Sequence, residues 1–363
     1  MSLPPGAPAS SLFEVRSTPS SGRGLFALRA IPAHTPLLTA PAPALSVILR
    51  EYRREVCAHC FAYAAGREWK LRCAGTGHAF CSVACEAAWR ADDDDDGTVA
   101  AAWRAVEGLC KGRRSSRQEQ EQADDDDDDD DDDEALADAD APRPTSAAVA
   151  RAWKAAEAQA ALIRAARAAA APGGAPASKA ARKAVRAALG ARAAPDALAF
   201  LLAGVLCRRR APAAWAAVGA LAHDAAPYRT AAELGAAVAA YLQLVAAVPA
   251  ALLGACAAET CVASQGRDAR NSFGIRSLGD DGSEFLGYGI WPVASYFNHS
   301  CAPNVGKRRV GRRWEFWAER DVGEGEELCI TYQSGEDHLS RGQRREALER
   351  NWGFDCACER CME

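Results

Sequence analysis

The sequence lacks a strongly apolar segment at its start, where residues 1–11 are rich in Pro and Ala. A secretory signal needs such a segment, so we expect none. Collagen-like, disulfide-scaffold and wholly disordered chains are also excluded, since 29 glycines and 14 cysteines are spread over 363 residues that are 49% hydrophobic. Without a signal, clustered cysteines more often bind metal than form disulfides. We therefore expect an intracellular protein of the nucleus, the cytoplasm or both.

A long, strongly apolar run is missing as well. Residues 234–258 carry no charge and are long enough to cross a bilayer, but they are mostly alanine and include Gln243 and Pro249. Membrane-spanning helices need predominantly strongly apolar side chains. We expect a buried helix here and no contact with a membrane.

The net charge of -5 hides two opposite contributions. Aspartate runs at 92–96 and 124–133 hold 15 of the 48 acidic residues, so in the remainder 43 basic residues face 33 acidic ones, a net charge of +10. Such runs are typical of solvated loops, and steering of basic protein tails is the second interpretation. The basic remainder keeps a nucleic-acid binder open as a further function, but no base-reading motif accompanies it, and we expect no direct contact with nucleic acid.

Composition divides the chain into five segments: 1–50, 51–110, 111–143, 144–265 and 266–363. Strands are predicted at 12–16, 25–29, 305–310, 313–318 and 328–332. The third segment is polar and then almost purely aspartate, which predicts a disordered loop. The fourth is rich in alanine, the best helix former, which predicts several helices. Their breaks are expected at Pro172-Gly173-Gly174, Pro195, Pro212, Pro227 and Pro249.

Two cysteine pairs in the second segment predict a zinc site. They are the C-x2-C pair Cys57 and Cys60 and the C-x3-C pair Cys81 and Cys85. Four thiolates close a tetrahedral zinc site, and a helix is expected to begin at the second pair. Four buried or free cysteines are the alternative. Cys73, His78 and Cys110 are left over, either as three candidates for a second zinc or as lone structural residues.

Three further cysteines form a C-x-C-x2-C pattern near residue 363, at Cys356, Cys358 and Cys361. Three thiolates leave a zinc ion unsaturated, and Cys301 is the natural fourth candidate. Such a site would hold this segment against the turn that contains Cys301. A redox role is the rival interpretation.

The segment Asn298-His299-Ser300-Cys301-Ala302-Pro303-Asn304 resembles the N-H-S-C-x-P-N signature of SET-domain protein lysine methyltransferases. Residues 22–26, Gly-Arg-Gly-Leu-Phe, are similar to the family's N-terminal G-x-G-L strand, and 323–332 are similar to its G-E-E-L-x-I-x-Y strand. The C-x-C-x2-C pattern resembles the post-SET zinc motif. A cysteine finger between the first strands and the core resembles the SET-and-MYND subfamily.

The resemblance implies an α+β fold of short SET strands in 1–50 and 266–340, with a MYND-like zinc finger at 51–110 inserted between them. An Ala-rich helical insert at 144–265 and a post-SET zinc site at 341–363 complete this arrangement. Val106 stands where the MYND pattern has a histidine, so the finger is expected to be half-occupied by zinc. Trp291 replaces the tyrosine that usually precedes the proline. We also expect no C-terminal helical-repeat domain of the kind found in larger members.

The same resemblance implies a protein-lysine N-methyltransferase that takes its methyl group from S-adenosylmethionine. The partner would be a protein bearing a lysine, histone or non-histone. Catalysis is assigned to Tyr332. The implied cofactor-binding residues are Arg23, Gly24, Ser295, Asn298, His299, Tyr332 and Phe354, and the eight clustered cysteines would hold two zinc ions. A catalytically inactive SET and zinc-finger interaction module is the alternative.

Overall fold

The computed structural model describes residues 3–18, 22–91, 97–121, 142–191, 193–279, 284–333 and 339–362. The chain forms two compact units, each built from separated stretches. The first comprises Met1–Ser46, Ala211–Asp224 and Arg267–Glu363, and the second comprises Val47–Arg210 and Ala225–Gly266. Both aspartate runs lie outside the described residues, and the boundaries of the six predicted domains remain predictions.

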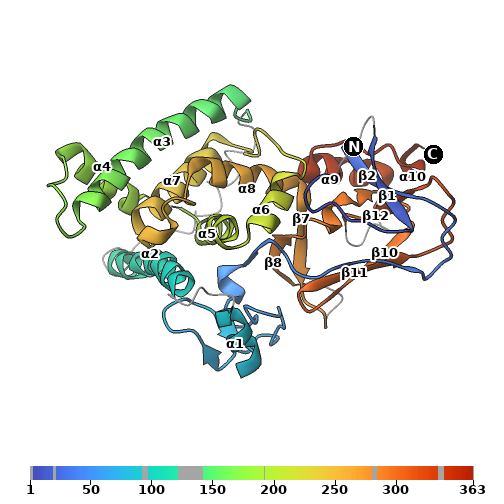
Figure 1. The fold of residues 1–363 in the computed structure, drawn as a ribbon, viewed down its shortest axis with the longest axis horizontal. Helices are drawn as coiled ribbons and strands as arrows, with labels where there is room; N and C mark the ends of the chain where they lie inside the picture. The colour runs from blue at the N-terminus through green and yellow to red at the C-terminus, as the bar shows by residue number, and fades with distance from the viewer. Residues whose placement is uncertain are drawn as a thin grey trace. The chain divides into compact units, whose positions relative to one another are not determined.

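In the first unit, strands from the two ends of the sequence pair with one another, as the blue and orange arrows in Figure 1 show. One sheet has the order β1-β2-β12-β9, a second has β10-β11-β3, and a third has β4-β8-β7. Their bounds are β1 Phe13–Thr18, β2 Gly22–Ala27, β3 Pro36–Ala40, β4 Leu45–Ile48, β7 Ser272–Arg276, β8 Phe285–Ile290, β9 Asn298–His299, β10 Val305–Val310, β11 Arg313–Ala318 and β12 Glu327–Ile330. The predicted strands correspond to β1, β2, β10, β11 and β12, and β10 and β11 have the expected bounds.

Strand β12 organises the first sheet because it pairs on both sides. It runs antiparallel to β2, with Leu328 opposite Leu25, and parallel to β9, with Ile330 opposite His299. Leu25, Leu328 and Ile330 are fully buried. A slip of one residue would turn these side chains to the other face, so burial fixes the register. The chain that leaves β12 toward Tyr332 therefore lies beside the turn that follows His299.

The helices of this unit are α6 (Pro212–Gly219), η3 (Ala294–Tyr296), α9 (Arg341–Trp352) and α10 (Glu359–Met362), together with the end of α8 (Ala258–Asn271). Ser340 caps α9 in a capping box with Gln343. The helix ends at Gly353, whose φ of 72° lies in the left-handed region that glycine favours. The chain thus turns sharply after Trp352 into the segment that carries the last three cysteines.

The second unit contains the cysteine finger and most of the helical insert. Its elements are η1 (Arg50–Tyr52), β5 (Leu71–Arg72), β6 (Ala79–Phe80), α1 (Val83–Ala91), α2 (Thr98–Glu121), α3 (Ser146–Ala169), α4 (Lys179–Gly190), α5 (Pro195–Arg210), α7 (Ala231–Ala247) and η2 (Ala250–Leu252). The predicted helices are confirmed, and prolines mark their ends: α5 and α6 begin at Pro195 and Pro212, and α7 ends before Pro249. Helix α2 continues to Glu121, into the segment for which a loop was predicted.

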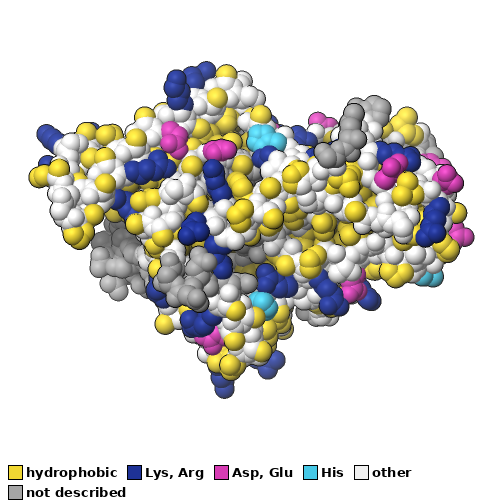
Figure 2. Space-filling view, in the orientation of Figure 1, with side chains coloured by type: hydrophobic (Ala, Val, Ile, Leu, Met, Phe, Trp, Pro, Cys, Tyr) yellow, Lys and Arg dark blue, Asp and Glu magenta, His cyan; other side chains and the backbone are white. Residues whose placement is uncertain are grey.

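Residues 234–258 do not form one continuous helix, because Pro249 separates α7 from η2. Within the described part of the chain, no single helix is long and apolar enough to cross a membrane, and the bent pair α4–α5 meets that requirement by length and composition only. On the face drawn in Figure 2, Lys and Arg side chains are scattered among hydrophobic and acidic ones. The basic excess is therefore not gathered into one patch on that face.

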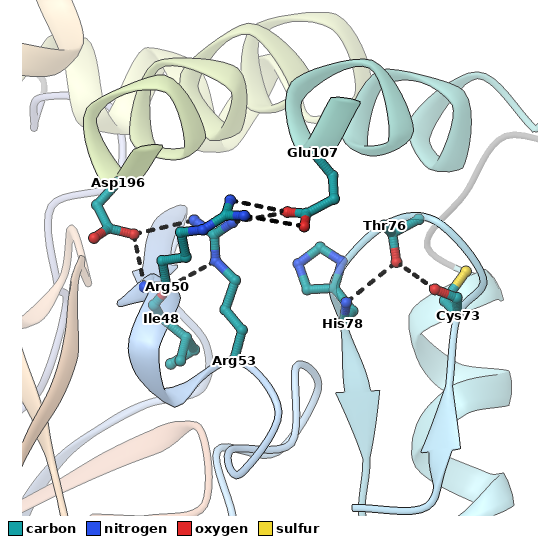
Figure 3. Close-up of polar contacts among 8 residues, drawn as sticks. All are labelled: Ile48, Arg50, Arg53, Cys73, Thr76, His78, Glu107 and Asp196. Atoms are coloured by element: carbon teal, nitrogen blue, oxygen red, sulfur yellow. Dashed lines mark hydrogen bonds and ion pairs between the residues drawn. The ribbon is translucent and has the colours of Figure 1, made fainter. Parts of the chain in front are cut away.

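Two arginines that follow β4 are held between helices α2 and α5 (Figure 3). Arg53 is 5% exposed, and its Nη2 lies 3.1 Å from Asp196 Oδ1 and its Nη1 3.9 Å from Glu107 Oε2. Arg50 also pairs with Glu107, at 3.2 Å. Burial lowers the pKa of Arg53, against the opposing influence of the two carboxylates. A buried cation of this kind is held in place by its paired carboxylates.

His78 lies next to this cluster, between two tryptophan rings (Figure 3 shows its position). Its ring centroid is 5.3 Å from that of Trp89 and 4.6 Å from that of Trp103. The Nδ1 atom is buried, and none of the described residues is its hydrogen-bond partner. Burial, followed by the charge of Arg53, lowers the pKa of His78 to about 3. The imidazole is therefore neutral at physiological pH.

Replacing Arg53 with Met should lower the free energy of unfolding by about 3 kcal/mol, because Glu107 and Asp196 lose a buried cation. The matched control is Arg54→Met, since Arg54 is 59% exposed and pairs with Glu68 at 3.1 Å. A surface pair contributes little, so this variant should change the unfolding free energy by less than about 0.5 kcal/mol. Urea denaturation followed by circular dichroism measures both, and equal effects would contradict a buried role for Arg53.

Stability should fall on acidification in part because His78 stays neutral in the fold. An unfolded histidine has a pKa of about 6.5. Below that pH the unfolded chain takes up a proton that folded His78, with its pKa of about 3, does not. The stabilisation is fully present above pH ~6.5 and is lost at up to about 1.4 kcal/mol per pH unit below it. A His78→Gln variant should lose less stability between pH 6.5 and 5, and parallel pH curves for the two proteins would refute the assignment.

Candidate functional site

The first unit contains a cleft of about 790 Å³. Six of the predicted cofactor-binding residues line it: Arg23, Ser295, Asn298, His299, Tyr332 and Phe354. Gly24, the seventh, is buried behind the cleft, where a Cβ atom would collide with the Glu327 carboxylate and lie 2.7 Å from Asn298 Nδ2. A side chain at this position would displace the Glu327 carboxylate and the Asn298 amide, which hydrogen-bond to each other. The structure therefore brings the seven residues together.

Tyr332 lies at the point where β12 leaves the sheet. Its hydroxyl donates a 2.9 Å hydrogen bond to the Phe297 carbonyl, and its backbone N–H donates to His299 Nδ1 at 3.0 Å. Burial, followed by Cys329 and Glu327, raises the pKa of Tyr332. The phenol therefore stays protonated and keeps a fixed direction.

His299 connects the cleft with the neighbouring cysteines. Because Nδ1 accepts from the N–H of Tyr332, the proton of a neutral ring is on Nε2, which lies 3.2 Å from Cys301 Sγ. Burial, then Lys307 and Arg344, lowers the pKa of His299 to about 4, so the ring is neutral. The side chain thus hydrogen-bonds in two directions, one toward Tyr332 and one toward the sulfur cluster.

Polar groups that face the cleft are oriented by contacts with the fold. The Asn298 amide donates to Glu327 Oε1 at 2.7 Å. The Arg23 guanidinium lies 5.3 Å from the centre of the Tyr296 ring and donates to the Ala220 carbonyl. The Ser295 hydroxyl lies 3.1 Å from the carbonyl oxygen of Asn271, so it is engaged by the backbone.

Several residues of the cleft were not predicted from the sequence. They are Leu221, Ala222 and His223 from the helical insert, Asn271 and Arg270 at the end of α8, and Trp352 at the end of α9. The insert residues carry no motif in their alanine-rich surroundings. Trp352 could have been predicted as a cleft residue, because it lies two positions before Phe354 in the post-SET segment. Its ring centroid lies 5.5 Å from that of Tyr332, so it extends the aromatic wall.

The last three cysteines and Cys301 meet beside the cleft, as predicted. Their sulfur atoms all lie within 4.8 Å of one another, with Cys301 Sγ 3.5 Å from Cys361 Sγ and 3.9 Å from Cys356 Sγ. Four thiolates around zinc at about 2.3 Å are separated by about 3.8 Å, so the donor set fits this metal. Buried Arg344 lies 4.0 Å from Cys361 Sγ and offsets part of the negative charge.

The finger in the second unit brings together the other predicted set, Cys57, Cys60, Cys81 and Cys85. Cys81 Sγ lies 3.5 Å from Cys60 Sγ and 3.5 Å from Cys85 Sγ, again the spacing of a four-thiolate zinc site. Cys85 belongs to α1, so the predicted helix is confirmed.

Across the described ranges, the groups with metal-ligand spacing are the two four-cysteine clusters. The leftover Cys73, His78 and Cys110 belong to neither group. Val106, which replaces the expected histidine, is fully buried on α2. Glu107, the residue after Val106, forms ion pairs with Arg50 and Arg53.

Comparison with known proteins places these observations in a family. The SET domain matches residues 22–333, from β2 to the residue after Tyr332. The chain is similar to a "potential protein lysine methyltransferase" of Saccharomyces cerevisiae, with 46% identity over 26% of this chain and 26% of the relative. A "histone-lysine N-methyltransferase" of Yarrowia lipolytica is 48% identical over 22% of this chain and 17% of its own length. A SET and MYND domain-containing protein of Dictyostelium discoideum is 34% identical over 25% and 22%.

These alignments span about a quarter of the curated relatives or less. The family match is far longer and covers most of the chain, including strands β2, β9 and β12 of the first sheet. It also includes the turn at Asn298 and the strand that leads to Tyr332. The chain belongs to the SET domain family, and the proteins similar to it include SET and MYND domain-containing proteins.

Proposed function

We propose that the cleft binds S-adenosylmethionine and that the protein methylates a lysine side chain of another protein. One observation carries this proposal: the turn at Asn298, the catalytic candidate Tyr332 and the aromatic segment at Phe354 face the same cleft in a chain of the SET family. The names of the yeast relatives support lysine as the acceptor, and the Yarrowia name supports histones among the substrates. The reaction would take place inside the cell, where the clustered thiols remain reduced.

The bound cofactor would supply an electrophilic methyl group on a sulfonium. In this proposal Asn298 and the backbone around Gly24 hold it, because both lie where β2, β9 and β12 meet. Arg23, fixed on the Tyr296 ring, and the Phe354 ring form further walls. Aromatic walls suit cations, including a methylated ammonium, through cation–π attraction.

The acceptor lysine has to lose its proton, since its free pKa is about 10.4. An apolar aromatic channel beside a positive sulfonium disfavours the ammonium form. The chain therefore needs to exclude water and align the amine, and it needs no paired carboxylates for this. Tyr332 is suited to alignment because its hydroxyl is fixed on the Phe297 carbonyl and leaves oxygen lone pairs toward the reacting groups.

We also propose one zinc ion in each four-cysteine cluster. In the first unit, zinc would hold Cys356, Cys358 and Cys361 to Cys301, and through them the segment that contains Phe354. In the finger, it would hold the second cysteine pair, at the start of α1, to the first. Both would be structural sites, because four thiolates leave no open position.

Replacing Tyr332 with Phe should reduce methyl transfer by about 100-fold, because one oriented polar group is removed from the transition state. The measurement is transfer of radiolabelled methyl from S-adenosylmethionine to histones and to a cell lysate. Cofactor affinity, measured by calorimetry, should change little. Equal labelling by the two proteins would reject Tyr332 as the catalytic residue, and a wild-type protein that binds no cofactor would favour the inert interaction module.

Purified protein should contain two zinc ions per chain by elemental analysis. Cys361→Ser should contain one and should bind S-adenosylmethionine more weakly, because the segment at Phe354 is released. Cys85→Ser should also contain one, but its cofactor affinity should match the wild type. Two zinc ions retained in Cys361→Ser, or equal loss of affinity in both variants, would contradict the assignment.

A further inference from the structure

We propose that Arg270 is a positioning residue that ties the insert wall of the cleft to its post-SET wall and so controls how long the cofactor stays bound. This inference rests on the proposed function, since it concerns the same cleft. It assigns a role to a residue that belongs to none of the sequence motifs.

The insert wall is the segment 219–224, and four side chains from the SET part of the unit hold it. Arg23 donates to the Ala220 carbonyl, and Arg267 donates to the Gly219 carbonyl at 2.5 Å. The Asn271 amide donates to the Ala222 carbonyl at 2.9 Å. Arg270 Nη2 lies 3.2 Å from Asp224 Oδ2. Of these contacts, the last is an ion pair between side chains, so it depends most on the charge of both partners.

Arg270 also reaches the opposite wall. Its Nη1 donates to the Trp352 carbonyl at 3.2 Å. Trp352 is the last residue of α9, so this carbonyl lies at the negative end of the helix, where a cation is favourable. The turn at Gly353 lies beside the same guanidinium, since a Cβ atom added there would be 3.5 Å from Nη2. The planar guanidinium can make both contacts at once because its nitrogens point in different directions.

The post-SET wall in turn touches the reacting region. The Trp352 ring packs on Tyr332 with centroids 5.5 Å apart, and the Phe354 ring lies edge-on to Tyr332 at 6.3 Å. A shift of the Trp352 carbonyl would therefore move the aromatic wall against Tyr332. Arg270 itself also lines the cleft, together with His223 from the insert wall. Loss of Arg270 would leave the cysteine cluster intact but separate two walls that enclose one cavity.

The test uses this 363-residue chain with three single variants, one double variant and one control. Arg270→Ala should weaken binding of S-adenosylhomocysteine about tenfold, mainly through faster dissociation in stopped-flow measurements. Arg270→Lys, which keeps the charge but reaches one partner at a time, should recover part of the affinity. Asp224→Asn should show an intermediate loss and should have no further effect in the Arg270→Ala background. Arg350→Ala, which removes an exposed pair with Glu346 on α9, is the matched control.

Hydrogen exchange provides a readout that does not depend on the cofactor. In Arg270→Ala, exchange should rise at 219–224 and at 352–358, while zinc content stays at the wild-type value. Unchanged exchange and unchanged dissociation would overturn the role of Arg270. A different result would separate this inference from the proposed function. If wild-type protein bound no cofactor but exchange still rose in both walls of Arg270→Ala, the proposed function would be refuted. The tie between the two walls would still be established.

Discussion

The convergence of four sulfur atoms at Cys301, Cys356, Cys358 and Cys361 is the constraint on which the cleft depends. Without a cation, four thiolates at this spacing would repel one another, so the cluster is stable as thiols or around a metal. The cluster lies beside the turn at Asn298. It therefore holds a segment from late in the sequence against residues of the first sheet. The described part of this segment contributes one short helix and no strand, so the cysteine cluster is a main contact that holds the wall at Phe354 in place.

The first sheet also fixes the position of Tyr332. Strand β12 is held between an antiparallel neighbour from the N-terminal part of the sequence and a parallel neighbour that carries Asn298 and His299. Buried leucines fix the register, and His299 then accepts from the backbone of Tyr332 while facing Cys301 with its other nitrogen. Strand pairing, cysteine cluster and tyrosine orientation are therefore linked through one neutral imidazole.

Much of the fold and most of the site could be predicted from the sequence, for identifiable reasons. The two strands at 305–310 and 313–318, the proline-bounded helices and the cysteine patterns have local signatures that tertiary packing did not override. The order of motifs was specific enough to place Asn298 and Tyr332 in one site. What the sequence could not show were contacts made by residues without a motif. The carbonyls of 219–222 and the partners of Arg270 are set by how a segment of the insert packs on the SET strands. Arg53, Glu107 and Asp196 likewise meet only in three dimensions.

A crystal structure with S-adenosylhomocysteine, with anomalous data collected at the zinc edge, tests the central claim most directly. The account predicts one anomalous peak between the sulfur atoms of Cys301, Cys356, Cys358 and Cys361, and cofactor density in the cleft between Asn298 and Phe354 with its sulfur directed toward Tyr332. Cofactor bound elsewhere, or four separated sulfurs without metal, would contradict it.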